Sequence, residues 1–356
     1  MATFETRGFH HVTMVSGDAP RTLAFYRDTL GLGLIKQTVN YDDPAAYHLY
    51  FGDHTGSPGT LLTFFEWKGL PQGRPGIGGV HHVALGVADK AALLKWKRWL
   101  TDRGVPVTGP KNRGYFASLY FTDPDGQILE IATKGPGYTI DEPAESLGST
   151  VVQPAPSQLE GSPEADAFER RTHPEPVTSL TPDMALDGIH HISSIGTRLD
   201  RLHAFYQEAL GLVRIKQTVN QDDLRTAHHF WAHLEHGMVT PRSSMTVFGW
   251  PPNYKYTAGG VGQTHHVAFR ARDAEEQAAW REHLIANGVA VSPVMERNYF
   301  KSIYFRDPDG LLLEIATDGP GFGIDEALDQ LGKRLALPAW LEGEREQIER
   351  ELVPLT

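Results

Sequence analysis

The chain has 356 residues, of which 40% are hydrophobic and 22% charged, and this length suggests two or three domains with ample residues for buried cores. Its net charge of −11 argues against a nucleic-acid partner, because phosphate binding needs clustered Lys and Arg. The sequence contains no cysteine, which excludes disulfides and thiolate ligands, so any metal must be held by His, Asp or Glu.

The chain opens with MATFETRGFHHVTMV, which lacks the basic start and apolar core of a signal peptide. No apolar run approaches the roughly 18 residues that a membrane span requires, so we expect a cytoplasmic protein without a membrane partner. The first predicted strand carries His10 and His11. A helix is predicted at about 19–30, where Gly31 ends it, and strands follow, including one at 60–66.

A second module of the same kind follows. It begins with a strand carrying His81 and His82, continues with a helix at about 89–103, and contains a strand at 115–122. The sequence DPDG at 123–126 is typical of a type I turn, and the apolar run ILEIA at 128–132 predicts a buried strand. Residues 149–187, rich in Pro, Glu and Ser, fit either a disordered linker or a packed, degenerate copy of the C-terminal tail.

The rest of the chain repeats what precedes it. Residues 9–43 recur at 189–223, and residues 79–148 recur at 263–332. Each module has the order strand, helix, several antiparallel strands, which predicts an α+β protein of four modules in two homologous halves. We expect halves at 1–148 and 188–332, a connecting segment at 149–187, and a tail with a short amphipathic helix at 333–356.

Each of the four modules carries a pair of adjacent histidines in its first strand. Adjacent side chains in a strand point to opposite faces. The second histidine of each pair shares its face with mostly small or polar residues, as expected beside a cavity, whereas the first shares a face with residues typical of a core. Alternation therefore predicts a cavity-facing set of four: His11, His82, His191 and His266.

Two glutamates stand in otherwise apolar strands, Glu130 in ILEIA and Glu314 in LLEIA. Burying an unpaired carboxylate costs several kcal/mol, so each needs a cation, either a metal or a neighbouring basic side chain. Two imidazoles and one carboxylate form the facial triad that suits non-haem Fe(II). The repeat allows two triads, drawn either within the halves (His11, His82, Glu130 and His191, His266, Glu314) or across them (His11, His266, Glu314 and His191, His82, Glu130).

An arginine and a tyrosine recur at fixed offsets before each glutamate. Tyr304 lies ten residues before Glu314, and Arg297 lies seven before Tyr304. Arg113 and Tyr120 repeat this spacing in the first half. Near a metal, such a pair could stabilise an anionic phenolate; alternatively, the tyrosine is a core residue and the arginine is solvated.

The four-module pattern resembles the vicinal oxygen chelate superfamily, which includes glyoxalase I, fosfomycin-resistance and bleomycin-binding proteins, and extradiol ring-cleaving dioxygenases. Within it, the runs GFHHVTM, KQTVNYDDPAAYHLYFGD, TGSPGT and HHVA resemble the hydroquinone ring-cleaving dioxygenases. The resemblance covers nearly the whole chain. It implies four βαβββ modules and an Fe(II)-dependent enzyme that opens a hydroquinone-type or catechol-type ring with O2.

The resemblance also implies particular site residues. It selects the crossed triad His11, His266 and Glu314 for Fe(II), and it places His10, His265, Arg297 and Tyr304 around the substrate. Either first histidine is then a candidate base for the phenolic proton. Strict alternation would turn His10 and His265 away from the metal, so their role requires a β-bulge or a site at the strand entrance. The mirror triad is intact, and a second metal there stays open.

Two rival functions fit the same resemblance. A glyoxalase-like isomerase or lyase usually needs an additional carboxylate or amide ligand as base, where this chain offers His11. A metal-free binding or resistance protein typically loses the ligands, whereas every ligand position here is filled. The expected partners are a small aromatic substrate and O2; a homo-oligomer stays open.

Overall fold

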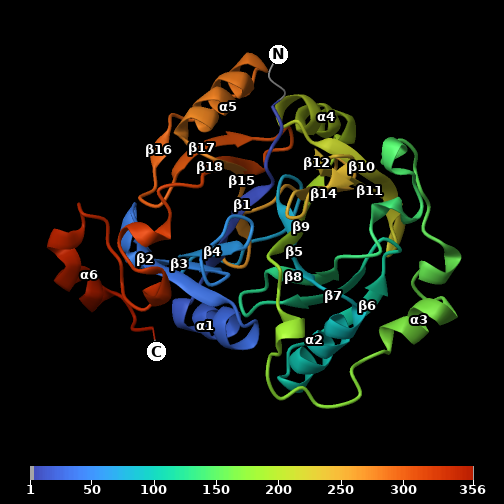
Figure 1. Cartoon of the computed structure of the whole chain (residues 1–356), viewed down its shortest axis with the longest axis horizontal. Coiled ribbons are helices and arrows are strands. Elements are labelled where there is room, and N and C mark those ends of the chain that lie inside the picture. The colour runs from blue at the N-terminus through green and yellow to red at the C-terminus, as the bar shows by residue number, and fades with distance from the viewer. Residues whose placement is uncertain (1–3, 356) are drawn as a thin grey trace.

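Residues 4–355 are described by the structure, a computed structural model, and their strands form two curled eight-stranded sheets that lie side by side (Figure 1). In spatial order, the first sheet consists of β16 (Met295–Glu296), β17 (Lys301–Arg306), β18 (Leu312–Thr317), β15 (Thr264–Ala271), β1 (Phe9–Ser16), β4 (Leu61–Glu66), β3 (Asp43–Gly52) and β2 (Gly33–Asn40).

The second sheet repeats this arrangement with the other two modules. Its order is β10 (Val213–Asn220), β11 (Asp223–Ala232), β14 (Ser244–Gly249), β9 (Ile189–Gly196), β5 (Val80–Val87), β8 (Ile128–Thr133), β7 (Ala117–Thr122) and β6 (Thr108–Asn112). A short hairpin of β12 (Leu234–Glu235) and β13 (Met238–Val239) stands apart from both sheets.

Each sheet combines one module from each half of the sequence. In the first sheet β1 and β15 pair antiparallel at the centre, and each has its own module's last strand as a parallel neighbour, β4 beside β1 and β18 beside β15. The second sheet is built in the same way around β5 and β9. The α+β fold of four modules in two homologous halves is thereby confirmed, while the ranges 1–148 and 188–332 divide the sequence rather than the sheets.

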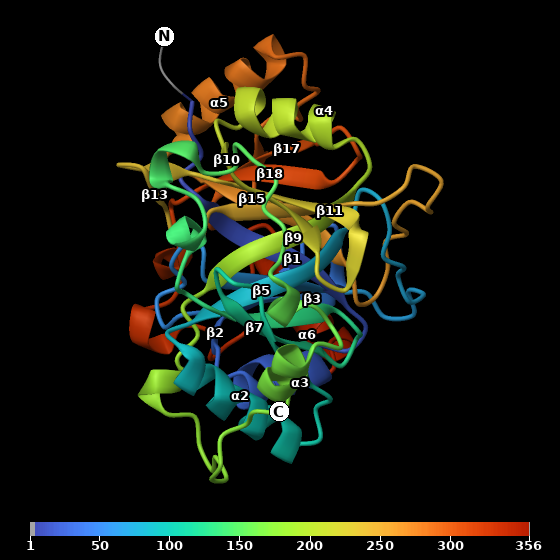
Figure 2. The same ribbon diagram turned by 90° about the vertical axis from the view of Figure 1, so that its right-hand side faces the viewer.

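The described residues form the helices α1 (Ala19–Leu23), α2 (Lys90–Asp102), α3 (Pro163–Glu169), α4 (Leu199–Ala204), α5 (Ala274–Ala286) and α6 (Arg345–Glu351). Asp89 is the N-cap of α2, and its side chain accepts a hydrogen bond from the Ala92 amide, which has no partner within the helix. The indole of Trp99 on α2 donates to the carbonyl of Thr29, 2.8 Å away, so the helices of the first two modules pack together. Figure 2 shows α4 and α5 grouped in the same way at the opposite end.

The helix expected at 19–30 is divided in the structure. Its first turn is α1, and a π-helical turn follows at Ala24–Thr29, with a matching turn at Phe205–Ala209 after α4. Gly31 ends the first of these with a φ of 71° and Gly104 follows α2 with a φ of 76°, a backbone conformation that glycine adopts without strain. None of the helices between residues 4 and 355 combines the length and the apolar composition that crossing a bilayer demands.

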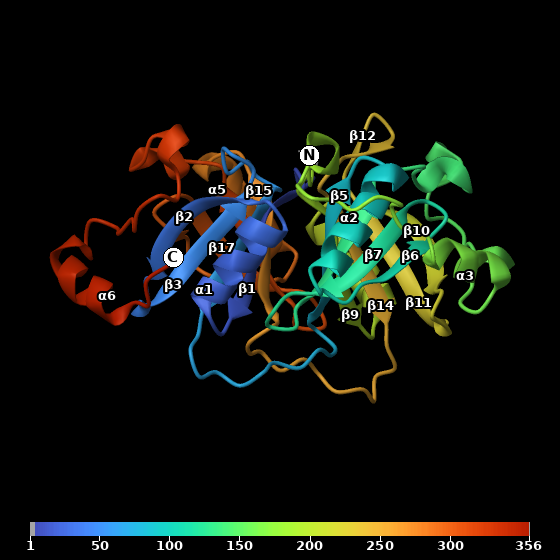
Figure 3. The ribbon, with the colours of Figure 1, turned by 90° about the horizontal axis from the view of Figure 1, so that it is seen from below.

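The connecting segment and the C-terminal tail take equivalent courses at first. Val151 bridges to Gln217 on β10, and Leu335 bridges to Gln37 on β2. Beyond these bridges, the connecting segment contains α3 and the tail contains α6, which lie at opposite ends of the molecule (Figure 3). Each segment therefore runs beside an outer strand before it reaches its helix.

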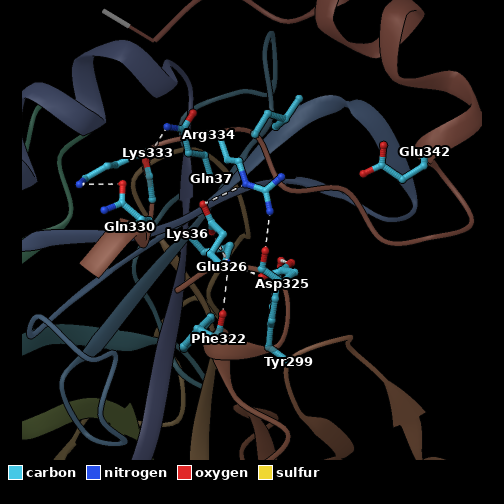
Figure 4. A network of polar contacts seen from close by, with 12 residues as sticks. Lys36, Gln37, Tyr299, Phe322, Asp325, Glu326, Gln330, Lys333, Arg334 and Glu342 are labelled. Carbon is cyan, nitrogen blue, oxygen red and sulfur yellow. Dashed lines mark hydrogen bonds and ion pairs between the residues drawn. The ribbon is translucent and has the colours of Figure 1, made fainter. Parts of the chain in front are cut away.

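A buried lysine ties the outer strand β2 to the loop that follows β18 (Figure 4). The ammonium group of Lys36, which is fully buried, lies 2.6 Å from Asp325 and also pairs with the buried Glu326. The ring of Tyr299 lies 4.8 Å below the same ammonium group. Lys216 repeats this arrangement on β10 with Asp141 and Glu142. The repeated run KQTVN thus supplies one buried cation to each sheet, where it joins modules from different halves.

Candidate metal centres

Irregular pairing of the two central strands lets the first histidine of each pair contact the second. Phe9 pairs with Phe269 and His11 with Ala268, so two steps along β1 match one step along β15, and His10 sits in a β-bulge. His265 occupies the corresponding bulge on β15. A bulge places an extra residue in one strand and re-aims its side chain. The β-bulge that the sequence required for a role of His10 and His265 at the site is therefore present in both strands.

Three side chains from three strands converge on the concave side of the first sheet. The Nε2 atoms of His11 (β1) and His266 (β15) are 3.1 Å apart. Oε2 of Glu314 (β18) lies 2.8 Å from Nε2 of His266 and 3.5 Å from Nε2 of His11. We call these residues the first cluster. Ligand atoms in adjacent positions around a first-row metal, with bonds of about 2.1 Å, lie roughly 3 Å apart, so the donor set fits one metal ion.

The carboxylate of Glu314 lacks the partners that a buried charge needs. It is fully buried, and Ser302 donates a hydrogen bond of 2.5 Å to its Oε1. Its Oε2 makes no hydrogen bond, although it faces the two imidazoles. Among residues 4–355, no Lys or Arg forms an ion pair with Glu314. A divalent cation between Oε2 and the two Nε2 atoms would remove the cost of burying this charge.

The first histidine of each pair orients the second. Nδ1 of His10 lies 2.9 Å from Nδ1 of His11, and Nδ1 of His265 lies 2.8 Å from Nδ1 of His266. An imidazole that binds a metal through Nε2 carries its proton on Nδ1, so with a metal bound His11 and His266 would donate these bonds. His10 and His265 would then accept through Nδ1 and keep their own protons on Nε2. Burial, helped by the neighbouring His266, lowers the pKa of His265 to about 4, which keeps it neutral.

Replacing His10 by leucine is expected to weaken metal binding at the first cluster by about 10–100-fold, because the acceptor that holds His11 in its ligating tautomer is lost. His10→Asn is the matched control, since its carbonyl oxygen can take the position of Nδ1 and should retain most of the affinity. Competition with a chromophoric chelator measures both constants. Equal affinities in wild type and His10→Leu would contradict an orienting role.

A cavity of about 250 Å³ opens beside the first cluster. Its walls include His11, His265 and His266, the aromatic rings of Phe65, Trp67 and Phe300, and the polar pair Arg297 and Tyr304. An apolar cavity of about 150 Å³ is enough to hold benzene, so this one admits a substituted aromatic ring. His10 does not line it, and the structure therefore brings six of the seven predicted site residues to the cavity or the cluster, with His10 behind them.

Arg297 and Tyr304 present hydrogen-bond donors to the cavity. The Nε of Arg297 donates to the Tyr304 hydroxyl over 3.3 Å, and the carboxylate of Asp42 lines the same cavity. Tyr304 pairs across the strands with Glu314, which places both side chains on one face of the sheet. Burial, together with the charge of Glu314, raises the pKa of the Tyr304 phenol, so the hydroxyl keeps its proton at neutral pH.

Several residues at the site were not predicted from the sequence, among them the aromatic Phe65, Trp67 and Phe300 and the polar His48 and Ser302. His48 on β3 lines the cavity, with its Nε2 3.3 Å from the Thr63 hydroxyl and its Nδ1 3.1 Å from the Tyr50 hydroxyl. Ser302 supports Glu314, as described above. Strand alternation could have indicated Ser302, which stands two residues before Tyr304 and so shares its face. His48 lies in the quoted run YHLYFGD, but its face depends on pairing with β4.

The second sheet carries a mirror arrangement, the second cluster, formed by His82 (β5), His191 (β9) and Glu130 (β8). Nε2 of His82 lies 3.2 Å from Nε2 of His191 and 2.9 Å from Oε2 of Glu130, and His191 lies 3.3 Å from the same oxygen. Of the two ways to group these residues, the structure brings together the crossed sets, because each cluster contains residues from both halves. The three residues of each cluster fit one metal ion.

Paired βαβββ modules with a two-histidine, one-carboxylate cluster in each curled sheet define a class of metal-site proteins. The chain belongs to the Glyoxalase/Bleomycin resistance protein/Dioxygenase superfamily, whose profile matches residues 8–131 and 188–315. The resemblance stated from the sequence is thereby confirmed.

Named relatives match over nearly the whole chain. "Putative ring-cleaving dioxygenase MhqO" of Bacillus subtilis is 35% identical over 98% of this chain and 97% of the relative. The chlorohydroquinone/hydroquinone 1,2-dioxygenase of Sphingobium indicum is 28% identical over 97% of this chain and 95% of its own length. The crystal structure of a "putative dioxygenase" from Bacillus subtilis superposes with a TM-score of 0.79 at 32% identity, covering 99% of this chain and 98% of that one.

Proposed function

We propose that this protein is an Fe(II)-dependent dioxygenase that opens a hydroquinone-type or catechol-type aromatic ring with O2. The observation that carries the proposal is an aromatic-walled cavity of about 250 Å³ that ends on the first cluster. The names of the relatives support the same reaction and favour a hydroquinone over a catechol. His11, His266 and Glu314 would hold the metal, and Arg297, Tyr304 and His265 would contact the substrate.

Two imidazoles and one carboxylate suit Fe(II), which when bound supplies a centre through which ring electrons reach O2. The chain's own residues then have three tasks. Phe65, Trp67 and Phe300 hold the ring and exclude water. Arg297, which lines the cavity, pairs with an anionic phenolic oxygen. Tyr304 donates its hydroxyl proton as a hydrogen bond to the negative charge that develops during ring opening.

The tautomers change the role proposed for the first histidines. With a metal on Nε2 of His11 and His266, His10 and His265 would accept hydrogen bonds through Nδ1, and their Nε2 atoms would then carry protons and could not take another. His265, which reaches the cavity, is therefore placed to donate a hydrogen bond to a substrate oxygen, and His10 is a positioning residue. Neither is left as a strong candidate for the base that removes the phenolic proton.

A glyoxalase-like reaction has less support. Such chemistry usually needs an additional carboxylate or amide ligand that doubles as the base, and each cluster found among residues 4–355 contains a single carboxylate. A protein loaded anaerobically with Fe(II) and given hydroquinone is expected to consume one O2 per ring opened, followed with an oxygen electrode and by the absorbance of the ring-opened product. No uptake across a panel of hydroquinones and catechols would remove the proposal.

Replacing Arg297 by methionine is expected to lower kcat/KM for hydroquinone by about 10²-fold, since the variant leaves the phenolate oxygen without its cationic partner. Arg297→Lys should recover part of this loss. Arg113→Met is the matched control, because Arg113 has the same place in the second sheet but faces Gln221 and Asp222. Steady-state O2 uptake measures all three. Equal losses in the two methionine variants would argue against a role for Arg297 in binding substrate.

A further inference from the structure

The second cluster shows the same unmet need for a cation as the first. Glu130 is fully buried, and Ser118 donates to its Oε1, while its Oε2 makes no hydrogen bond. Within residues 4–355 no Lys or Arg forms an ion pair with it. The atoms nearest to Oε2 are the Nε2 atoms of His82 and His191, at 2.9 and 3.3 Å. A carboxylate in this position is stabilised by a metal ion that it shares with both imidazoles.

The imidazoles of the second cluster are also held in the ligating orientation. Nδ1 of His81 lies 2.8 Å from Nδ1 of His82, and Nδ1 of His190 lies 2.8 Å from Nδ1 of His191. Both first histidines occupy β-bulges, as in the first sheet. Partners that fix the tautomer of a histidine are typical of metal ligands. The ligands of the second cluster are therefore oriented for a metal in the same way as those of the first cluster.

The surroundings of the two clusters differ in the space they leave. The cavity at the second cluster measures about 40 Å³, against about 250 Å³ at the first. Val152, Gln153, Pro154 and Gln158 of the connecting segment line the smaller cavity. The C-terminal tail, which follows the equivalent course beside β2, does not line the larger cavity at the first cluster. Its residues Leu337 and Leu341 are buried in the main hydrophobic core instead.

Two hydrogen bonds also hold Arg113 and Gln221 in place in the wall of the smaller cavity. Arg113 donates to the side-chain oxygen of Gln221 over 2.8 Å, and Gln221 donates to the carbonyl of Asn112 over 3.0 Å. The residue equivalent to Gln221 in the first sheet is Tyr41, whose buried hydroxyl has no hydrogen-bond partner among the described residues. A space of about 40 Å³ accommodates a few water molecules but not an aromatic ring, since benzene occupies a cavity of about 150 Å³.

We propose that His82, His191 and Glu130 bind a second divalent first-row metal ion, with water completing its coordination. This ion has a structural role and does not support ring cleavage. His82 and Glu130 come from the second module and His191 from the third, so the ion joins the two halves of the chain at the centre of the second sheet. Two imidazoles and a carboxylate accept Zn(II), Fe(II) or Mn(II), so availability decides which ion is bound.

Metal content per chain tests the proposal. Full-length protein is stripped with chelator, loaded anaerobically with Fe(II) or with Zn(II), desalted and analysed by mass spectrometry of the metal. Wild type is expected to retain two ions, Glu314→Gln one, Glu130→Gln one, and the double variant none. A wild-type content of one ion that Glu130→Gln leaves unchanged would overturn the second site.

Two further readouts separate this inference from the proposed dioxygenase. Glu314→Gln holds only the second ion, so Zn(II) should raise its melting temperature, whereas the double variant should show no shift. The same Glu314→Gln protein loaded with Fe(II) should consume no O2 with hydroquinone; sustained uptake would overturn the structural role. If wild type also shows no uptake while Glu314→Gln still retains one ion, the dioxygenase proposal fails and the second site stands.

Discussion

Replacing Glu314 by glutamine is expected to reduce ring cleavage by at least about 10³-fold, the largest effect on activity anticipated for a single change. Glutamine keeps the shape of the side chain but removes the negative charge that a divalent ion needs, and a loss of about 4 kcal/mol in stabilisation corresponds to that factor. The measurement is O2 uptake with hydroquinone after anaerobic loading with Fe(II). Activity within tenfold of wild type would show that the metal at the first cluster does not carry the reaction.

Glu130→Gln is the matched comparison, because it makes the same chemical change in the other sheet. Both glutamates are fully buried and both accept a hydrogen bond from a serine two residues before a tyrosine. Any general cost of placing an amide in this position is therefore common to the two variants. We expect Glu130→Gln to lose far less activity than Glu314→Gln; similar losses would point to damage of the fold.

Replacing Lys36 by methionine is expected to destabilise the protein by about 3–5 kcal/mol, the largest effect on stability anticipated here. The change removes the buried cation of Glu326 and leaves it only the exposed Arg334, 3.7 Å away, although methionine fills most of the volume of the lysine side chain. Urea denaturation followed by tryptophan fluorescence measures the free energy of unfolding. The effect should appear in the transition that reports the first sheet, because Lys36 ties β2 to the loop after β18 (Figure 4).

Lys95→Met provides the control for that experiment. Lys95 forms an ion pair of 2.8 Å with Asp183, but both side chains are partly exposed, so water replaces the lost partner. A small change in Lys95→Met beside a large one in Lys36→Met is expected. If Lys36→Met unfolded at the urea concentration of wild type, the buried pair would not hold the two modules together.

Much of the fold could be predicted from internal repetition. The segments 9–43 and 189–223 align without gaps, and each module shows the same order of strand, helix and strands, so the α+β architecture followed from the sequence. The second histidines and the glutamates were also identified, because alternation in a strand separates side chains onto two faces. The resemblance to a known family then selected the crossed triad.

Other features depend on contacts that the sequence does not display. Alternation shows which side chains share a face of one strand, but it does not show which strands pair. The crossed grouping depends on the pairing of β1 with β15, a strand more than 250 residues away in the sequence. The orienting role proposed for His10 depends on a bulge, which strict alternation does not include. Lys36 sits in a recognisable repeated run, but its partners Asp325 and Glu326 lie nearly 300 residues further on.

The most direct test of the central claim is anomalous diffraction at the iron absorption edge from crystals of the full chain loaded anaerobically with Fe(II). We expect an anomalous peak at bonding distance, about 2.2 Å, from Nε2 of His11, Nε2 of His266 and Oε2 of Glu314. Iron found elsewhere, with the Glu314 carboxylate neutralised by a protonated imidazole instead of a metal, would contradict it.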